Sequence, residues 1–370
     1  MTRPAASQRK VVLIAGGGTG GHLMPALAIA SALEQEAPGL EPVLVGAVRG
    51  VEATLLPARD FRYVLLPSEP IYRRTWWKNA RWPLLAGELI RRVDQLFRVE
   101  RPAAVLGTGG YASAPVVWWA ARRGIPTAIQ EQNAYPGLAT RWLSRRVRHV
   151  YLGLPEARGL LRFGRATEVF ETGNPITPPT PERRTAARLE FGLDGSRPVV
   201  LVTGGSQGAL ALNRAVAGWL DRGGPGDADL LWVTGRATHE EFARYHRPPA
   251  VRVVDFLDPM ADGYAVADLV VSRAGMITVA ELCAWGLPSI LVPLPTAAAD
   301  HQTHNARVLA EAGAARLLLQ SALTPEILAQ SVTELLHEGS AREAMAARAK
   351  ARGRPHAARD IVSRLLTLIG

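Results

Sequence analysis

Short apolar runs alternate with longer amphipathic segments along most of this chain of 370 residues. The short runs are rich in valine, leucine and isoleucine, and the segments between them space their apolar residues as helices do. This alternation is typical of stacked βαβ units, whose strands form a parallel sheet. The expected strands form two series, the first at residues 11–15, 42–46, 103–107 and 126–130, and the second at residues 198–204, 230–235, 251–256, 267–272 and 288–293.

The two series begin alike. Residues 11–33 read VVLIAGGGTGGHLMPALAIASAL and residues 198–220 read PVVLVTGGSQGALALNRAVAGWL, each a strand, a glycine-rich turn and a helix. We therefore expect two doubly wound α/β domains rather than one extended sheet. Their expected ranges are residues 1–175 and 184–345, with a proline-rich linker at 176–183 and a C-terminal helix over 346–370 that packs back on the first domain.

Composition narrows the class of protein. No apolar run approaches the roughly 18 residues of a membrane span, and the first run ends too early for a signal peptide, which indicates a cytoplasmic protein. Cys283 is the only cysteine, so an internal disulfide and a multi-cysteine metal site are excluded. The net charge of +10 comes almost entirely from arginine, and no recognition-helix motif accompanies it, so we expect no nucleic-acid partner.

The first glycine loop has the spacing of a dinucleotide site, because Gly16, Gly18 and Gly21 satisfy G-x-G-x-x-G. Such a site also needs an acidic residue at the end of the second strand, to bind ribose hydroxyls. The first acid after the strand at 42–46 is Glu52, which argues against nicotinamide or flavin binding. The loop is still suited to bind an anion, because glycines and a helix N-terminus together form an anion-binding site.

Three further segments repeat that device at expected strand ends. They are GTGGYASAP at residues 107–115, GGSQGA at 204–209 and SRAGMITVAEL at 272–282. In the last, a helix starting near Gly275 would place Glu281 about one turn further in, which suits a carboxylate that accepts ribose hydroxyls. Because ligands of open parallel sheets bind at the carboxyl ends of the strands, we expect phosphate-bearing ligands in a cleft shared by two facing sheets.

Several motifs between residue 11 and about residue 315 resemble those of the MurG glycosyltransferases. They are GGGTGGHLMPALAIA, GTGGYASAPVVWWAARRGIPTAIQEQNAYPGLATRWL, TGNPI, VTGGSQGALALN, SRAGMITVAELCAWGLPSILVP and DHQTHNARVLAEAGAA. The resemblance implies a GT-B fold, with two facing Rossmann-like domains. It implies inverting transfer of N-acetylglucosamine from UDP-GlcNAc to the C4 hydroxyl of undecaprenyl-diphospho-muramoyl-pentapeptide (lipid I to lipid II), at the cytoplasmic face of the membrane. Peptidoglycan synthesis, and with it cell shape and division, would depend on that step.

The resemblance also implies residue roles. Glu281 would hold the ribose, the backbone near Leu257 would pair with uracil, and Gln302 would contact hydroxyls of the transferred sugar. The implied donor-binding residues are Thr19, Gly20, Gly21, Asn133, Ser206, Leu257, Met276, Ile277, Thr278, Val279, Ala280, Glu281 and Gln302, and the implied acceptor-binding residues are Gly109, Gly110 and Tyr111.

The chain departs from the family pattern at three positions. Thr177 follows GNPI where many members carry an arginine, which removes one expected phosphate contact. Gln130 stands where a histidine often precedes EQN, so this position supplies no acid or base. Thr303 follows Gln302 where some members have a second glutamine.

Inverting transfer needs a base for the acceptor hydroxyl and stabilisation of the departing UDP. His22 is the candidate base, because histidine titrates near working pH. Two alternatives stay open: His22 hydrogen-bonds only a phosphate or a neighbouring loop, or Glu131 is the base. For UDP, Ser206 and the helix N-terminus near Met276 form a positive environment, so neither a metal nor another cofactor is expected.

A membrane contact is expected from residues 72–101, which hold eight basic and three acidic residues. The run RRTWWK at 73–78 suits an anionic membrane surface, whereas Trp118 and Trp119 suit a core equally well. Other cell-wall synthesis proteins are possible partners. The rival functions are another GT-B transferase acting from a UDP-sugar on a lipid, and a UDP-GlcNAc 2-epimerase.

Overall fold

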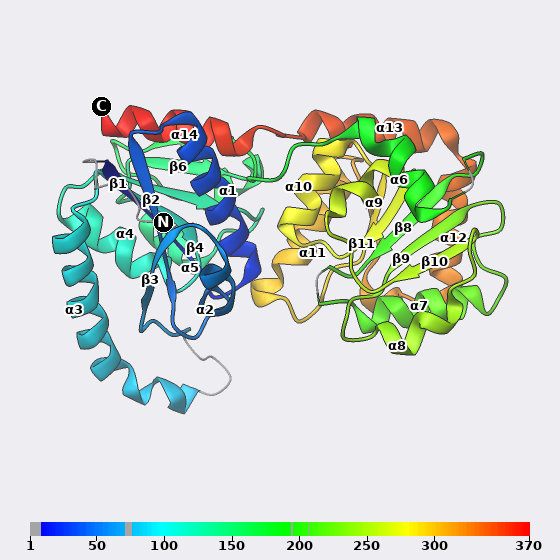
Figure 1. Ribbon diagram of the computed structural model, residues 1–370, viewed down its shortest axis with the longest axis horizontal. Coiled ribbons are helices and arrows are strands. Elements are labelled where there is room, and N and C mark those ends of the chain that lie inside the picture. The colour runs from blue at the N-terminus through cyan, green and yellow to red at the C-terminus, as the bar shows by residue number, and fades with distance from the viewer. Residues whose placement is uncertain (1–8, 71–75, 194, 206) are drawn as a thin grey trace, which may run out of the picture. The chain divides into compact units, whose positions relative to one another are not determined.

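A computed structural model describes residues 9–70, 76–193, 195–205 and 207–370. The chain divides into two compact units, the first ending at Ile176 and resuming at His356, the second running from Thr177 to Pro355 (Figure 1). Each unit holds its own sheet, and every strand pair that is described is parallel. The expected fold class, two Rossmann-like α/β domains, is confirmed.

Unit 1 carries a sheet with the order β3-β2-β1-β4-β5-β6-β7. Its strands are β1 (Lys10–Gly16), β2 (Leu40–Ala47), β3 (Arg62–Leu66), β4 (Ala104–Gly109), β5 (Thr127–Glu131), β6 (His149–Leu152) and β7 (Glu168–Phe170). Its α-helices are α1 (Gly20–Glu36), α2 (Glu52–Leu55), α3 (Trp82–Glu100), α4 (Ser113–Arg122), α5 (Leu138–Leu143) and α14 (Ala357–Ile369).

Both faces of this sheet are covered, which explains why its strands are apolar runs rather than alternating ones. Along β1, Leu13 joins the core beneath α3 and α4, whereas its neighbour Ile14 joins the core beneath α1 and α14. Successive side chains of a strand point to opposite faces, so one strand serves two cores. The carboxyl ends of β1, β4 and β5 then meet at one edge.

Unit 2 repeats the arrangement with the order β10-β9-β8-β11-β12-β13. Its strands are β8 (Val199–Thr203), β9 (Asp229–Val233), β10 (Val251–Val254), β11 (Leu269–Ser272), β12 (Ser289–Leu291) and β13 (Arg316–Leu317). Its α-helices are α6 (Arg184–Phe191), α7 (Leu210–Leu220), α8 (His239–Phe242), α9 (Met260–Val266), α10 (Met276–Trp285), α11 (His301–Glu311), α12 (Pro325–His337) and α13 (Gly339–Arg352).

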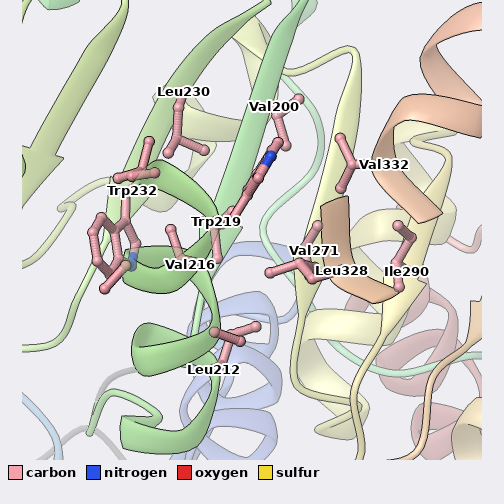
Figure 2. Packing of buried hydrophobic residues seen from close by; sticks show 14 of the residues in the cluster. Val200, Leu212, Val216, Trp219, Leu230, Trp232, Val271, Ile290, Leu328 and Val332 are labelled. Atoms are coloured by element: carbon pink, nitrogen blue, oxygen red, sulfur yellow. The ribbon is translucent and has the colours of Figure 1, made fainter. Parts of the chain in front are cut away.

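The core of unit 2 is built on two buried tryptophans. Figure 2 shows Trp219 on α7 and Trp232 on β9 among aliphatic side chains of β8, β11 and α12. Trp232 donates its indole N–H to Asn213 Oδ1 at 3.0 Å, which satisfies the one polar group of a fully buried ring. This bond joins β9 to α7, the helix that follows the glycine loop of unit 2.

The C-terminal segment forms two helices instead of the single helix expected over residues 346–370. Helix α13 belongs to unit 2, and α14 packs against α1 in unit 1. Gly353 follows α13 because a Cβ there would lie 2.7 Å from the carbonyl oxygen of Cys283. Pro355 then prevents the helix from continuing. Ile361, Val362 and Leu365 of α14 complete the core under α1.

Candidate active site

The first glycine loop joins β1 to α1 in unit 1. Thr19 is the N-cap of α1 in extended conformation, and its hydroxyl lies 3.1 Å from His22 Nδ1. Thr19, Gly20 and Gly21 are exposed, and His22 is half-buried. Thr108 at the end of β4 donates its hydroxyl to the carbonyl of His22 at 2.9 Å. The candidate base is therefore fixed from both its ring and its backbone.

The second glycine loop lies directly against the first. Gly110 has φ +78°, and a Cβ there would lie 1.8 Å from the carbonyl oxygen of Gly17. Gly109 has φ +99°, and a Cβ there would lie 2.7 Å from Cδ2 of His22. The ring of Tyr111 packs on Gly18, where a Cβ would approach it to 2.5 Å. The predicted acceptor residues and His22 thus come together in one unit.

The EQN segment follows β5 at the same sheet edge. Glu131 is buried, and its carboxylate accepts the backbone N–H groups of Asn133 and Gly137, each at 3.0 Å. It also accepts the side-chain amide of Asn133 at 3.3 Å. Gly137 is the N-cap of α5, so the carboxylate complements the start of that helix. Through these bonds Glu131 orients Asn133. Because its carboxylate oxygens already accept these hydrogen bonds, Glu131 is less suited to act as the base.

Buried amides explain the glutamine at position 130. Gln130 donates to Asn174 Oδ1 at 2.8 Å, and Asn174 donates to the carbonyl of Gln132 at 3.0 Å. Gln132 donates in turn to the carbonyl of Thr108 at 2.6 Å. This network ties the ends of β4 and β5 to the TGNPI segment. Sequence reasoning missed Gln132 and Asn174, because they show no signal beyond lying in motifs.

In unit 2 the corresponding glycine loop joins β8 to α7. Gly208 has φ +74°, and a Cβ there would lie 2.5 Å from the carbonyl oxygen of Thr234, at the end of β9. Asn213 holds that end by donating to the same carbonyl at 2.8 Å. Ser206, which is predicted to contact the UDP phosphates, lies outside the described residues.

Helix α10 begins at the end of β11, with Gly275 as its N-cap. Met276 and Val279 are buried in the core, whereas Ile277, Thr278 and Ala280 are half-buried. The side chains of Met276 and Val279 therefore stabilise the fold. What this turn can offer a ligand is its backbone N–H groups, which lack acceptors within the helix, and its positive dipole end.

Glu281 lies on the same helix and is half-buried. Tyr264 of α9 donates its hydroxyl to Glu281 Oε2 at 2.9 Å, and the same hydroxyl is hydrogen-bonded to Thr278. Burial raises the pKa of Glu281 to about 7, while the bond from Tyr264 acts in the opposite direction. Sequence reasoning missed Tyr264, because nothing in the spacing of 17 residues brings it to the carboxylate.

Gln302 and Leu257 lie on other loops of unit 2. The side-chain oxygen of Gln302 accepts the backbone N–H of Leu294 at 2.9 Å, so its NH₂ group is the part suited to contact a sugar. Leu257 is half-buried and packs its Cδ1 near Gly263. Thr303, one of the departures, is buried and donates to Asp300 Oδ1 at 2.6 Å, at the start of α11.

Side chains capable of binding metal are scattered across the described part of the chain. Within it, no three histidine, cysteine, aspartate or glutamate residues form a group that could hold a metal ion.

Comparisons with known proteins agree with this layout. Residues 12–152 match the model of the glycosyltransferase family 28 N-terminal domain, and residues 199–363 match the model of that family's C-terminal domain. A relative from Moorella thermoacetica, named UDP-N-acetylglucosamine--N-acetylmuramyl-(pentapeptide) pyrophosphoryl-undecaprenol N-acetylglucosamine transferase, is 39% identical over 368 residues. The alignment covers 97% of this chain and 99% of the relative.

Solved structures resemble this chain as well. The crystal structure of Acinetobacter baumannii MurG matches with a TM-score of 0.78 and 30% identity, covering 97% of this chain and 99% of that one. A putative UDP-N-acetylglucosamine 2-epimerase from Listeria monocytogenes has a TM-score of 0.63 at 16% identity, over 96% of this chain and 95% of that one, and so shares the fold alone.

The two parallel-sheet domains match the two domain models of glycosyltransferase family 28, so the chain is a glycosyltransferase with the GT-B fold. The chain belongs to the MurG family within glycosyltransferase family 28. The resemblance carried by the sequence motifs is confirmed.

Proposed function

We propose that this enzyme carries out the reaction named for its relatives, the transfer of N-acetylglucosamine from UDP-GlcNAc to undecaprenyl-diphospho-muramoyl-pentapeptide. The observation that carries this proposal is the near full-length identity of 39% to a relative with that named activity. The transfer inverts the anomeric carbon in one displacement. The sugar C1–phosphate bond breaks, a bond from C1 to the acceptor C4 oxygen forms, and UDP leaves with the electron pair.

Unit 1 supplies the acceptor site and the base in this proposal. His22 takes the proton of the C4 hydroxyl, and Thr19 sets the orientation of the imidazole. Gly109, Gly110 and Tyr111 adjoin the His22 ring and the first loop, which suits contact with the acceptor. Asn133, oriented by Glu131, lies at the same sheet edge and contacts the donor sugar, together with Thr19, Gly20 and Gly21.

Unit 2 supplies the UDP site. The backbone of the first turn of α10, from Met276 to Ala280, stabilises the charge that develops on UDP, with Ser206 as a further contact. The ionised Glu281 accepts ribose hydroxyls, the backbone near Leu257 pairs with uracil, and Gln302 donates to a sugar hydroxyl. No metal takes part in this scheme, because the helix terminus provides the positive field.

The test is UDP release from UDP-GlcNAc, with and without a lipid-linked muramoyl-peptide. Release that depends on this acceptor, with formation of a disaccharide lipid, is the expected result. Epimerisation of UDP-GlcNAc without an acceptor would favour the rival 2-epimerase, and transfer to diacylglycerol would favour another lipid transferase.

We further propose that unit 1 docks on the anionic cytoplasmic face of the membrane, where the lipid acceptor is. No helix in the described ranges is both long enough and apolar enough to cross a bilayer. Trp77 and Leu84, near the start of α3, expose 59% and 83% of their surface and lie in or just after the basic run at residues 73–78, a combination that suits an anionic membrane surface. Residues 73–75 of the basic run lie outside the described residues.

A second group of aromatic residues lies on α4 and α5. Trp118 stacks on Trp142 with centroids 6.3 Å apart, and Arg122 and Arg146 lie over these rings at 5.1 and 4.8 Å. Trp118 and Trp119 pack against the core, whereas Trp142 is 46% exposed. Of these rings, Trp142 is therefore the one suited to the membrane interface.

Vesicle binding tests the docking face. Leu84→Glu should reduce the fraction bound to vesicles containing phosphatidylglycerol by about tenfold, because one apolar side chain no longer enters the interface. Leu189→Glu is the matched control, since Leu189 is 78% exposed on unit 2. The proposal would be contradicted if vesicle binding of the parent protein did not depend on the anionic lipid content. It would also be contradicted if both variants lost vesicle binding equally.

A further inference from the structure

A buried carboxylate that the reaction scheme does not use lies against the first glycine loop of unit 1. Glu52 is the first residue of α2, and none of its surface is exposed. Its Oε1 accepts the backbone N–H of Gly18 at 2.8 Å and that of Ala47 at 2.9 Å. Oε2 lies 3.0 Å from the same Gly18 nitrogen. The carboxylate therefore joins the first glycine loop to the end of β2.

Three glycines make the space for this side chain. A Cβ on Gly17 would lie 1.9 Å from Oε1, one on Gly46 would lie 2.3 Å from Cγ, and one on Gly50 would lie 2.3 Å from the carboxyl carbon. Among the described residues, no arginine or lysine forms an ion pair with Glu52. Its partners are backbone N–H groups. A buried carboxylate is costly unless it is hydrogen-bonded, so its stability depends on how well these N–H groups are placed.

Glycine loops of this type usually offer such amides to a phosphate from outside the protein. Here the Gly18 amide is already bonded to an internal carboxylate, so a substrate phosphate cannot take that position without displacing Glu52. The donors that remain at this helix start are those of the first turn, at Gly20 and Gly21, which have no acceptor within the helix.

We propose that Glu52 is a positioning residue, which fills the anion position of the first glycine loop and thereby fixes Thr19 and His22 for the transfer step. The inference rests on the proposed role of His22. It also assigns the acceptor diphosphate to donors other than the Gly18 amide. The length of the side chain, which reaches both Gly18 and Ala47, matters more than its charge.

Three variants at position 52 distinguish the effect of side-chain length from the effect of charge. Glu52→Gln keeps the length and an acceptor oxygen at the position of Oε1, so kcat should stay within about fivefold of the parent. Glu52→Asp keeps the charge but is one methylene too short to reach both amides, so kcat should fall about 10²-fold because the loop shifts. Glu52→Ala should fall at least as far. The KM for UDP-GlcNAc should stay within about twofold in all three, since unit 2 holds UDP.

Glu100→Gln is the matched control, because Glu100 is a nearly buried carboxylate of the same unit that pairs with Arg62. It should leave kcat unchanged. Hydrogen exchange of the peptide covering residues 16–24 gives a second readout, and it should accelerate in Glu52→Asp but not in Glu52→Gln. This measurement remains informative if Glu52→Ala does not fold.

The reverse order, with Glu52→Asp as active as the parent and Glu52→Gln strongly impaired, would overturn the inference. So would parent-like kcat in Glu52→Ala. Failure of the proposed function gives a different result, because the parent protein would then show no UDP release that depends on the lipid-linked acceptor. Failure of the proposed role of His22 is distinguished in turn by a His22→Ala variant that keeps its turnover, whatever the Glu52 variants do.

Discussion

Units 1 and 2 have the same strand order around their first strands, yet only the first glycine loop of unit 1 is hydrogen-bonded to a carboxylate among the described residues. In unit 1, Glu52 lies after β2 and accepts the N–H of Gly18. In unit 2, the acids after β9, Glu240 and Glu241, are exposed, and no described carboxylate hydrogen-bonds to the loop at residues 204, 205 and 207–209. The loop of unit 1 is thus occupied by a carboxylate of the protein, whereas the loop of unit 2 suits a phosphate of a ligand. This difference fits a division into an acceptor unit and a nucleotide unit.

The largest expected effect comes from removing the base in unit 1. His22→Ala should lower kcat by about 10²- to 10⁴-fold, because no group then takes the acceptor proton. His337→Ala, an exposed histidine of unit 2, should have no effect. Steady-state turnover with a lipid-linked acceptor measures both variants. Unchanged turnover in His22→Ala would leave His22 with a hydrogen-bonding role alone.

The contact between the two glycine loops of unit 1 predicts a smaller, structural effect. Gly110→Ala should lower the free energy of unfolding by about 3 kcal/mol, because its φ is positive and its Cβ would collide with the carbonyl of Gly17. Gly124→Ala should cost only about 1 kcal/mol, because Gly124 has φ +70° but open space around it. Urea unfolding compares the two, and equal losses would mean that the loops do not touch as described.

The pH dependence of nucleotide binding probes unit 2. Ribose hydroxyls favour the ionised form of Glu281, whose pKa is about 7, so UDP affinity should fall as pH drops through 7. The same raised pKa favours the folded state at low pH, and this contribution to stability is lost as pH rises through 7. Affinity that does not change between pH 6 and pH 8, about a unit on either side of this pKa, would contradict the assignment.

Tyr264 provides the smallest and most specific test of that pair. Tyr264→Phe removes a bond that lowers the pKa of Glu281, so the pH dependence of UDP binding should move upward. Affinity at pH 7 should fall about fivefold. Tyr245→Phe is the control, because the Tyr245 hydroxyl donates to Asp221 instead. Isothermal titration with UDP measures both variants, and identical curves would assign Tyr264 to packing alone.

The sequence allowed the main strands to be predicted, because runs such as residues 11–15 and 198–204 are apolar on both faces. It did not reveal β3, β6, β7 or β13, which are short or carry polar residues such as Arg62, His149 and Glu168. The position of Glu52 in the sequence argued against a dinucleotide site, but its hydrogen bond to the glycine loop could not be predicted, because it is a contact across 34 residues. The partners Tyr264–Glu281 and Gln130–Asn174 were equally invisible, since tertiary packing and not spacing brings them together.

The most direct test of the division between the units is a paired measurement on His22→Ala and Glu281→Ala, with the Kd for UDP and kcat determined for each. The account predicts that His22→Ala binds UDP as the parent does and loses turnover, whereas Glu281→Ala binds UDP at least about tenfold more weakly. Loss of UDP binding in His22→Ala, or parent-like UDP binding in Glu281→Ala, would contradict it.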